Sequence, residues 1–510
     1  MSVPRAQRIV VDYDVDATMR DGTVLRADVM RPDRPGPLPV LLCRTPYGKA
    51  GAFFGPFLDG PAMARRGYLV VAQDVRGTGR SGGRWEPFVH EIDDGADTVR
   101  WAASLARSSG AVGMFGPSYL GYTQWAAAIS RPEPLRALVP ALTWSDAANG
   151  LLRRGGAPET GCTNYLHHYG FAAAVDVRIV DALAACRPDG AEITNPLLDL
   201  DPVDCSIPGR HPDPAPAVAA LGVAGWYDLF LAGTLDHFRR SRAGDRGTRL
   251  SRLVVGPWSH VNFGGHSGAH SFGQSAAFSE LAGVGLAGLA TQWFDHHLLG
   301  RPFEHPWLTG PPVRAFDMGT NEWVAHTDWP PPGAVPTDLA LRPSSPRTRL
   351  VEIGTAPPGR RAWPGGAIHM HPTHPAGVVR REPGAVEDAA RVLAMVTDVC
   401  TEPMTLAGPI DVVVTVRDLV GMVDLVARLL LVQTDGSVRN LADGVQRVDA
   451  ADTVVAHLDL WSTYVTVQAG ERLLLEVGGA AWPRWGSPAG GRLVLSPESV
   501  GLTAHVMCSR

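Results

Sequence analysis

Short apolar runs alternate with amphipathic stretches between residues 38 and about 260 of the chain. The runs are nearly continuous in hydrophobicity, which is typical of parallel strands that are covered on both faces. A turn and then a stretch with helical periodicity follow most of the runs. The pattern predicts an α/β class, with strands at 39–43, 68–72, 112–115, 135–142, 217–224 and 252–255 and helices at 57–66, 92–106, 119–130 and 229–240.

Two segments depart from this alternation. Residues 10–18 and 23–30 flank the turn Arg20-Asp21-Gly22, so we expect an antiparallel hairpin at the sheet edge. Residues 144–216 carry no clear strand and end in a proline-rich stretch, which predicts a mainly helical cap insertion.

The chain changes character after a helical stretch at 286–299. Short strands separated by turns, with no helices between them, favour an antiparallel sandwich or jelly roll. We expect its strands at 313–318, 339–341, 410–416, 427–433, 454–460, 472–477 and 492–495. The predicted division is a core at 1–143 and 217–305, the cap at 144–216 and a C-terminal β jelly-roll domain at 306–510.

Composition and charge exclude several classes of function. The 510 residues carry a net charge of −5, which offers no basic surface for nucleic acid or an anionic membrane. Lys49 is the only lysine, and its context lacks the glycine and Ser/Thr spacing of a P-loop, which argues against nucleotide-driven phosphoryl transfer. Six scattered cysteines and the lack of a signal-peptide apolar region predict a cytoplasmic protein. A homodimer is left open.

A serine in a small-residue turn is the first candidate for chemistry. Segment 112–121, Val-Gly-Met-Phe-Gly-Pro-Ser-Tyr-Leu-Gly, predicts a strand, a tight turn around Ser118 and then a helix. This is the context of a nucleophile elbow, although the second glycine is Gly121 and Leu120 occupies its usual position. The alternative is that Ser118 only caps the helix.

A serine nucleophile needs a basic partner and a carboxylate that orients it. Asp228 and His260 follow two later predicted strands, in the order Ser, Asp, His. Asp228 could instead cap a helix, and His260 could be an ordinary loop histidine. His266 and His270, which follow a glycine-rich stretch after His260, are weaker candidates for the base, because neither has the Gly-Pro-Trp-Ser-His context.

Several motifs together resemble the cocaine esterase and X-prolyl dipeptidyl-peptidase family of α/β-hydrolase serine hydrolases. They are Gly-x-Ser-Tyr-x-Gly at 116–121, Gly-Trp-Tyr-Asp at 225–228, Gly-Pro-Trp-Ser-His at 256–260, Arg-Thr-Pro-Tyr-Gly at 44–48 and the glycine-rich loop at 74–83. Segment 313–330 resembles the entry to that family's C-terminal jelly roll. The resemblance implies that Ser118 is the nucleophile, Asp228 the acid and His260 the base. It also implies that the Tyr47 hydroxyl and the Tyr119 backbone N–H form the oxyanion hole.

Other clusters have a plain structural interpretation beside a functional one. His90 to Asp94 is typical of a helix start, more than of a metal site, and Arg76 is more suited to anchoring a loop than to binding substrate. The histidines at 369, 371 and 374 fit a solvated link better than a metal site. Four aromatic residues could line an acyl pocket or pack in the core, namely Trp144, Trp226, Phe230 and Trp258.

The sequence thus predicts a serine hydrolase that cleaves carboxylic esters of a small-molecule acyl substrate and requires no metal or organic cofactor. One alternative is an aminopeptidase that releases X-Pro dipeptides, for which Asp146 and Glu159 are candidate partners of the substrate ammonium group. Another is a biosynthetic enzyme that uses the same fold for acyl transfer, cyclisation or carbon–carbon bond formation.

Overall fold

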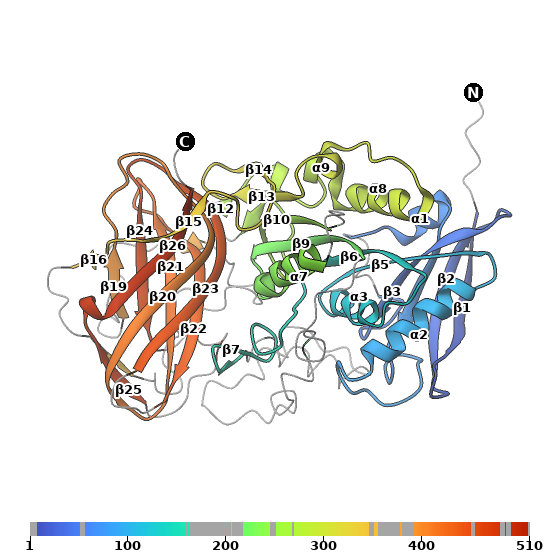
Figure 1. The fold of residues 1–510 in the computed structure, drawn as a ribbon, viewed down its shortest axis with the longest axis horizontal. Helices are drawn as coiled ribbons and strands as arrows, with labels where there is room; N and C mark the ends of the chain where they lie inside the picture. The colour runs from blue at the N-terminus through green and yellow to red at the C-terminus, as the bar shows by residue number, and fades with distance from the viewer. Residues whose placement is uncertain are drawn as a thin grey trace.

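The fold is described by a computed structural model of the chain. The structure describes residues 8–51, 57–159, 162, 206, 218–244, 251–267, 270–345, 351–354, 378–379, 392–449, 454–479, 485 and 491–507. Figure 1 shows two bodies side by side, an α/β core and a β domain that contains the C-terminal strands. No helix within these ranges is both long and apolar enough to cross a lipid bilayer.

The core is built on one ten-stranded sheet, in the order β1-β2-β4-β3-β5-β6-β9-β10-β13-β14. Its central strands are parallel, and the antiparallel hairpin predicted at the N-terminus forms one edge. The strands are β1 (Ile9–Thr18), β2 (Val24–Pro32), β3 (Leu38–Thr45), β4 (Leu69–Asp74), β5 (Ser108–Pro117), β6 (Leu135–Ala141), β9 (Ala219–Tyr227), β10 (Ser251–Ser259), β13 (Val313–Asp317) and β14 (Glu322–His326). The continuous apolar runs therefore become strands buried on both faces, as predicted.

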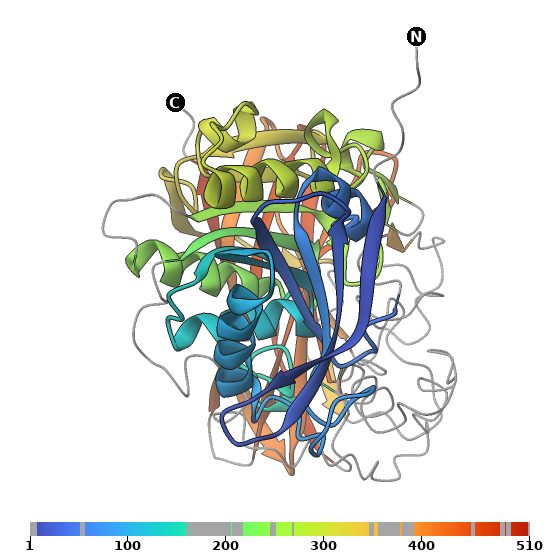
Figure 2. The same ribbon diagram turned by 90° about the vertical axis from the view of Figure 1, so that its right-hand side faces the viewer.

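Helices cover both faces of this sheet. Figures 1 and 2 show α1 (Gly60–Arg66) and α8 (Gly285–Leu299) on one face, and α2 (Glu91–Ser104), α3 (Tyr119–Ile129) and α7 (Leu231–Gly244) on the other. The short helix α9 (Pro306–Thr309) follows α8. The start of α1 is encoded locally, because the Asp59 side chain accepts a hydrogen bond from the Ala62 N–H and Gly67 ends the helix in a left-handed conformation.

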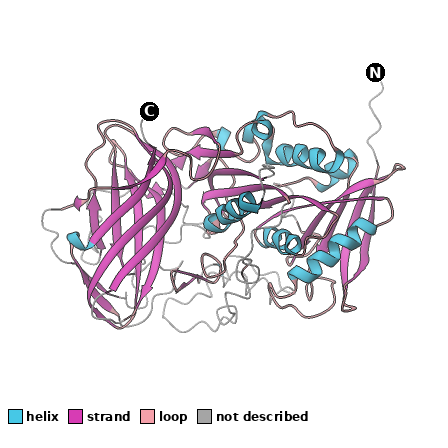
Figure 3. Ribbon diagram, viewed as in Figure 1, coloured by secondary structure: helices cyan, strands magenta, loops and turns pink. Residues whose placement is uncertain are grey.

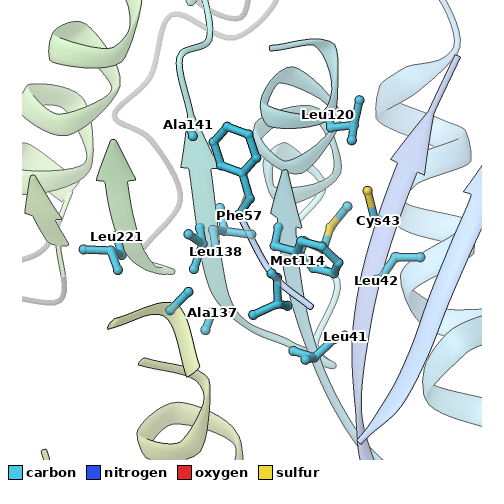
Figure 4. Packing of buried hydrophobic residues seen from close by; sticks show 14 of the residues in the cluster. Leu41, Leu42, Cys43, Phe57, Met114, Leu120, Ala137, Leu138, Ala141 and Leu221 are labelled. Atoms are coloured by element: carbon cyan, nitrogen blue, oxygen red, sulfur yellow. The ribbon is translucent and has the colours of Figure 1, made fainter. Parts of the chain in front are cut away.

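The apolar core of this body lies between the sheet and the helices on its two faces. Figure 4 shows buried side chains of neighbouring strands, among them Leu41 and Leu42 of β3, Met114 of β5 and Leu138 of β6, all four of which are fully buried. Such a rigid centre holds the carboxyl ends of the strands in fixed positions. Residues that follow those strand ends are therefore placed by the core itself.

The predicted cap can be judged only at its start. Residues 144–159 are described and contain the short strands β7 (Arg153–Arg154) and β8 (Ala157–Pro158). Apart from Cys162 and Ser206, the rest of 144–216 lies outside the described residues. The helical character of this insertion remains a prediction.

The C-terminal body consists of two antiparallel sheets that share one hydrophobic cluster (Figures 1 and 3). The first contains β15 (Ala334–Asp338), β26 (Val500–Met507), β20 (Met404–Val420), β25 (Arg492–Leu495), β17 (Val351–Gly354) and β23 (Val454–Val467). The second contains β16 (Arg342–Pro343), β19 (Val392–Val396), β24 (Arg472–Gly478), β21 (Val423–Val432), β22 (Val438–Val448) and β18 (Val378–Val379). The antiparallel C-terminal domain is thereby confirmed.

Two strand predictions for this domain are wrong. Segment 313–318, expected in the sandwich, forms β13, which pairs in parallel with β10 and extends the core sheet. Residues 339–341 are not a strand, and the pairing with β26 is made by β15 just before them. An apolar run shows that a strand is buried but does not show which sheet it joins, because both sheets bury similar residues.

Core and sandwich are joined by direct contacts close to the strand ends of the core. The Tyr227 hydroxyl donates to the Asn440 carbonyl of β22 at 3.1 Å. The Arg154 guanidinium lies 3.6 Å from the centre of the Trp461 ring. Such buried contacts fix the position of the sandwich relative to the end of β9.

Candidate active site

Ser118 lies between β5 and α3 in a strained backbone conformation. Its φ of 57° and ψ of −125° are unusual for a residue other than glycine. The Ser118 N–H donates to the Ala141 carbonyl at 2.9 Å, and Thr143 Oγ1 donates to the Ser118 carbonyl at 2.8 Å. Bonds on both sides of the residue therefore hold the strained turn in place, as is common at functional sites.

The glycines around this turn explain its altered spacing. A Cβ atom on Gly116 would lie 2.6 Å from the Leu120 Cβ, so the Leu120 side chain fills the space over Gly116. A Cβ atom on Gly121 would lie 2.7 Å from the Thr143 Cβ, so Gly121 allows α3 to approach the end of β6. The second glycine is needed one position later than usual, because the close contact with Thr143, just after β6, occurs there.

His260 connects Ser118 to Asp228 through two hydrogen bonds. His260 Nε2 is 3.0 Å from Ser118 Oγ, and His260 Nδ1 is 2.8 Å from Asp228 Oδ1. The Asp228 side chain is fully buried and the His260 side chain is 12% exposed. Since a carboxylate faces Nδ1, we assign the proton to Nδ1, which leaves Nε2 free to accept from the Ser118 hydroxyl.

The structural alternatives for these three residues can be compared with this geometry. The Ser118 side chain makes no capping hydrogen bond to α3. Asp228 directs Oδ1 to His260, and α7 begins three residues later at Leu231. The sequence-predicted order Ser, Asp, His thus corresponds to one continuous set of hydrogen bonds in space.

The two weaker histidine candidates lie elsewhere. His266 is exposed in the short strand β11 (His266–Ser267). His270, in β12 (His270–Ser271), accepts a hydrogen bond from Arg439 Nη1 on its Nε2 at 2.9 Å. Burial, with the Arg439 charge adding to it, lowers the pKa of His270 to about 4. Among the described contacts, only those of His260 join Ser118 to a carboxylate.

Tyr47 and Tyr119, the predicted oxyanion-hole residues, lie at neighbouring strand ends. Their rings contact edge to face, with centroids 6.5 Å apart. Tyr47 follows β3, and its N–H donates to Thr45 Oγ1 at 3.0 Å. Tyr119 is the first residue of α3, where a backbone N–H has no carbonyl partner inside the helix. That N–H is therefore available to an oxyanion, whereas the Tyr119 hydroxyl is used elsewhere.

The Tyr119 hydroxyl belongs to a buried network that the sequence did not reveal. It donates to Glu91 Oε1 at 2.9 Å, while Glu91 Oε2 accepts from Arg44 Nη1 at 2.7 Å. Arg44 is completely buried and also donates to Gln73 Oε1 at 2.9 Å. Burial raises the pKa of Tyr119 well above its usual value, and the Glu91 charge adds to this, so the hydroxyl stays a neutral donor.

The other end of the Tyr47 loop is also held by charges. Lys49 Nζ is 2.7 Å from Asp14 Oδ1, 3.5 Å from Asp28 Oδ1 and 3.6 Å from Asp74 Oδ2, and its N–H donates to Asp74 Oδ1 at 2.6 Å. The Lys49 side chain is only 8% exposed. Tyr47 is thus carried by a short loop that buried ion pairs anchor on both sides. The one sign of this arrangement in the sequence was that Arg44, a charged residue, directly follows an apolar run.

The four candidate aromatic residues do not share one location. The Phe230 ring contacts the His260 ring edge to face at 5.0 Å between centroids, and Trp144 lies 5.0 Å from Phe230. Trp258 is fully buried, and its Nε1 donates to the Ala276 carbonyl at 2.6 Å. Trp226 packs against Trp329 at the junction with the sandwich. Only Phe230 and Trp144 are brought to the His260 side of the site.

Two polar candidates have structural partners. Arg76 donates twice to Asp94, at 2.9 and 2.6 Å, and to Asp21 at 2.7 Å, which fits a loop anchor. Helix α2 begins at Glu91 as expected, but His90 makes no capping bond and instead contacts Glu86 Oε2 at 2.9 Å.

The two proposed ammonium partners and the metal candidates can be placed only in part. Glu159 accepts from Trp485 Nε1 at 2.9 Å, and Asp146 accepts from Ser206 Oγ at 3.0 Å. Both carboxylates are therefore engaged within the protein. The histidines at 369, 371 and 374 lie outside the described residues, and the described part of the chain holds no group of three or more potential metal ligands.

Comparison with known families agrees with this architecture. The family model described as X-Pro dipeptidyl-peptidase (S15 family) matches residues 21–189. The model of the X-Pro dipeptidyl-peptidase C-terminal non-catalytic domain matches residues 306–507. The second match begins before β13 and β14, two strands that complete the core sheet.

Similar proteins extend over almost the whole chain. Cocaine esterase of Rhodococcus sp. (strain MB1 Bresler) is 29% identical over 541 aligned positions, which cover 93% of this chain and 92% of that protein. An aminopeptidase from the marine sediment archaeon Thaumarchaeota archaeon shares the fold with a TM-score of 0.78 and 18% identity, covering 100% and 98% of the two chains. An α-amino acid ester hydrolase has a TM-score of 0.74 and 19% identity, covering 99% and 98%.

The doubly covered sheet, with Ser118 at a strand-to-helix turn, defines an α/β-hydrolase with an additional antiparallel C-terminal domain. Its relatives act on esters or peptides. The chain belongs to the cocaine esterase and X-Pro dipeptidyl-peptidase family of serine hydrolases.

Proposed function

We propose that this protein hydrolyses carboxylic esters through an acyl-enzyme, with Ser118 as nucleophile, His260 as base and Asp228 as the orienting acid. The observation that carries the proposal is the pair of hydrogen bonds from His260, 3.0 Å to Ser118 Oγ and 2.8 Å to Asp228 Oδ1. Both lie in the range that proton transfer and tautomer control require.

The chemistry follows from these positions. His260 Nε2 takes the hydroxyl proton as Ser118 Oγ forms a bond to the ester carbonyl carbon. The tetrahedral intermediate collapses when its bond to the alcohol oxygen breaks, and the imidazolium gives its proton to that oxygen. Water then loses a proton to His260 and attacks the acyl-enzyme, which releases the carboxylic acid and regenerates the Ser118 hydroxyl. Asp228 stabilises the imidazolium in both steps.

The negative oxygen of the intermediate needs donors that are already in place. We propose the Tyr47 hydroxyl and the Tyr119 N–H for this role, supported by their adjacent strand-end positions and the edge-to-face contact of their rings. Phe230, which contacts His260, and its neighbour Trp144 are the proposed apolar wall beside the acyl group. No step in this scheme requires a metal or an organic cofactor.

The ester substrate is favoured over an X-Pro peptide by two observations. Cocaine esterase, which matches over nearly the full length of both chains, shares 29% identity with this chain, against 18% for the aminopeptidase that has the same fold. An aminopeptidase needs a carboxylate for the substrate ammonium group, and Glu159 is already bonded to Trp485 while Asp146 is bonded to Ser206. Cleavage of X-Pro amides is therefore measured beside ester hydrolysis in the experiment.

The test is an activity screen of the purified protein on short acyl esters, X-Pro amides and aminoacyl esters, with Ser118→Ala as control. We expect turnover on the acyl esters, abolished by Ser118→Ala, and labelling of Ser118 by a fluorophosphonate probe. Turnover confined to X-Pro amides would replace the ester proposal with the peptidase alternative. Labelling of a different serine would overturn the nucleophile assignment.

We propose a cytoplasmic location for the enzyme. Cys43 and Cys400 are free thiols among the described residues, and burial raises the pKa of both. Unreactive free thiols are typical of a reducing compartment.

A further inference from the structure

A small cavity lies behind Asp228, at the junction of core and sandwich. It has room for about one water molecule. The core contributes Trp226, Tyr227, Asp228 and Leu231 to its wall, and the sandwich contributes residues 440–443 of β22 and 460–462 of β23. The C-terminal domain therefore shares a cavity with the proposed catalytic acid.

Unpartnered polar atoms gather around this cavity. Asp228 Oδ2 is buried and accepts no hydrogen bond from any residue that the structure describes. Asn440 is only 5% exposed, and neither its Oδ1 nor its Nδ2 bonds to a described residue. A buried carboxylate oxygen or amide without a partner costs free energy, so groups of this kind are normally bonded directly or through water.

Both sandwich strands are irregular where they line the cavity. The pairing of β21 with β22 shifts by one residue, so that Leu441 is an extra residue next to Asn440. In β23, Trp461 has a φ of 66°, which is strained for a non-glycine residue. A regular strand presents alternate residues to one side, whereas here four consecutive residues of β22 line the same cavity. Bulges of this kind redirect side chains beside active sites.

The backbone of Asn440 is fixed next to Asp228. The Tyr227 hydroxyl, on the residue preceding Asp228, donates to the Asn440 carbonyl at 3.1 Å, and burial raises the pKa of Tyr227 to about 12. The other charged group on the cavity wall is Asp443, whose Oδ1 is 3.3 Å from Arg154 Nη1. Asn440 is thus a neutral residue with a fixed backbone, and it lines the same cavity as two carboxylates, of which Asp443 has an arginine partner.

We infer that Asn440 is a positioning residue for Asp228, acting through a water molecule in this cavity. The water accepts a hydrogen bond from Asn440 Nδ2 and donates one to Asp228 Oδ2, which satisfies two of the three unpartnered atoms. It holds the carboxylate plane so that Oδ1 stays directed at His260 Nδ1. The inference rests on the proposed catalytic residues. It assigns a part in catalysis to the C-terminal domain, which the family model describes as non-catalytic.

The first experiment measures the rate at which a fluorophosphonate labels Ser118 in the full-length chain. Asn440→Leu should slow labelling about tenfold, because it leaves Asp228 without the support of the amide. The matched control is Gln446→Leu, which removes an amide from the same strand outside the cavity wall and should leave the rate unchanged. The midpoint of thermal unfolding should not fall in Asn440→Leu, since an apolar side chain replaces a buried amide with no direct partner.

A second variant separates positioning from simple packing. Asn440→Asp adds a carboxylate near Asp228 and His260, which favours the protonated imidazole, so the pH at which labelling rises should move upward. Labelling within twofold of wild type in both variants, with an unmoved pH profile, would overturn the inference. If the wild-type Ser118 is not labelled, the catalytic assignment itself is wrong and the inference falls with it.

Discussion

The two sides of Ser118 are supported in different ways. On the oxyanion side, Tyr119 donates to Glu91, which pairs with Arg44, and the loop that carries Tyr47 is anchored by the ion pairs of Lys49. On the acid side, Asp228 makes one direct hydrogen bond to His260 and otherwise faces a cavity shared with the sandwich. One side is a closed ionic network, and the other is an interface between two domains.

This difference separates two requirements of the same reaction. Oxyanion donors must be rigid before the substrate arrives, because their effect depends on having no reorganisation to undergo. The base must instead take up and release a proton twice in each catalytic cycle, and the acid must stabilise it each time. Ion pairs inside one domain suit the first requirement, and a hydrated interface suits the second. Four substitutions test this difference between the two sides of Ser118.

The largest effect is expected from removing the base. His260→Ala should lower kcat on a hydrolysed ester by about 10⁴- to 10⁶-fold, because the Ser118 proton then has no acceptor. Steady-state kinetics measure this, with His266→Ala as the control that should stay active. Full activity in His260→Ala together with loss in His266→Ala would move the base to the other histidine.

Tyr47→Phe should have the next largest effect. It removes one oxygen and keeps the ring contact with Tyr119, so kcat should fall about 10²- to 10³-fold with KM nearly unchanged. The exposed Tyr13 offers a matched control, and Tyr13→Phe should change nothing. A near wild-type kcat in Tyr47→Phe would make Tyr47 a packing residue and leave the oxyanion to backbone donors.

Glu91→Gln tests whether the ionic network acts through the oxyanion hole. It leaves the buried Arg44 charge without a counter-ion, so unfolding free energy should fall by about 3–5 kcal/mol. We expect kcat to fall about tenfold, and Tyr47→Phe to cost less in this background than in wild type, since the two act on one feature. Denaturant unfolding and a double-mutant cycle measure both effects.

Exposed Glu86, paired with His90, provides the control for that substitution. Glu86→Gln should leave stability and kcat almost unchanged, because exposed ion pairs contribute little. Strict additivity of Glu91→Gln and Tyr47→Phe would show that the network stabilises the fold without positioning the oxyanion donors.

The smallest effect on activity is expected at His237, on the acid side. Burial lowers its pKa to about 4, and His237 Nε2 contacts the Trp144 carbonyl at 2.9 Å. Below pH 6.5 this histidine takes up a proton in the unfolded chain but stays neutral in the folded protein. Its contribution to the free energy of unfolding is therefore complete above pH 6.5 and is lost as the pH falls towards 4. The loss is on the order of 3 kcal/mol.

His237→Gln keeps a donor for the Trp144 carbonyl and removes the titration. Denaturant unfolding at a series of pH values should show a flatter slope between pH 6.5 and 4 than in wild type. His266→Gln, at an exposed position, should leave the slope as it is. An unchanged slope in His237→Gln would place the acid sensitivity in another buried histidine.

The sequence predicted what is local and periodic. Strand ends that carry Ser118, Asp228 and His260 could be found because each follows its own apolar run. The contacts of Glu91 and Asn440 could not, since they depend on which side chain from a distant segment arrives beside them. Glu91 had the pattern of an ordinary residue at the start of a helix. Asn440 lies in a strand whose bulge is not marked by any turn-forming residue in the sequence. The sheet joined by β13 was misassigned for the same reason.

The pairing of β13 with β10 bears on how this chain can be divided for expression. A truncated protein that ends at residue 305 would lose β13 and β14 and expose the hydrogen-bonding edge of β10, a strand buried in the full chain. The complementary fragment would carry those two strands without the sheet they belong to. Open strand edges of this kind pair with other molecules and promote aggregation. A cut placed after β14, beyond His326, keeps the ten-stranded sheet closed by its own edge hairpin.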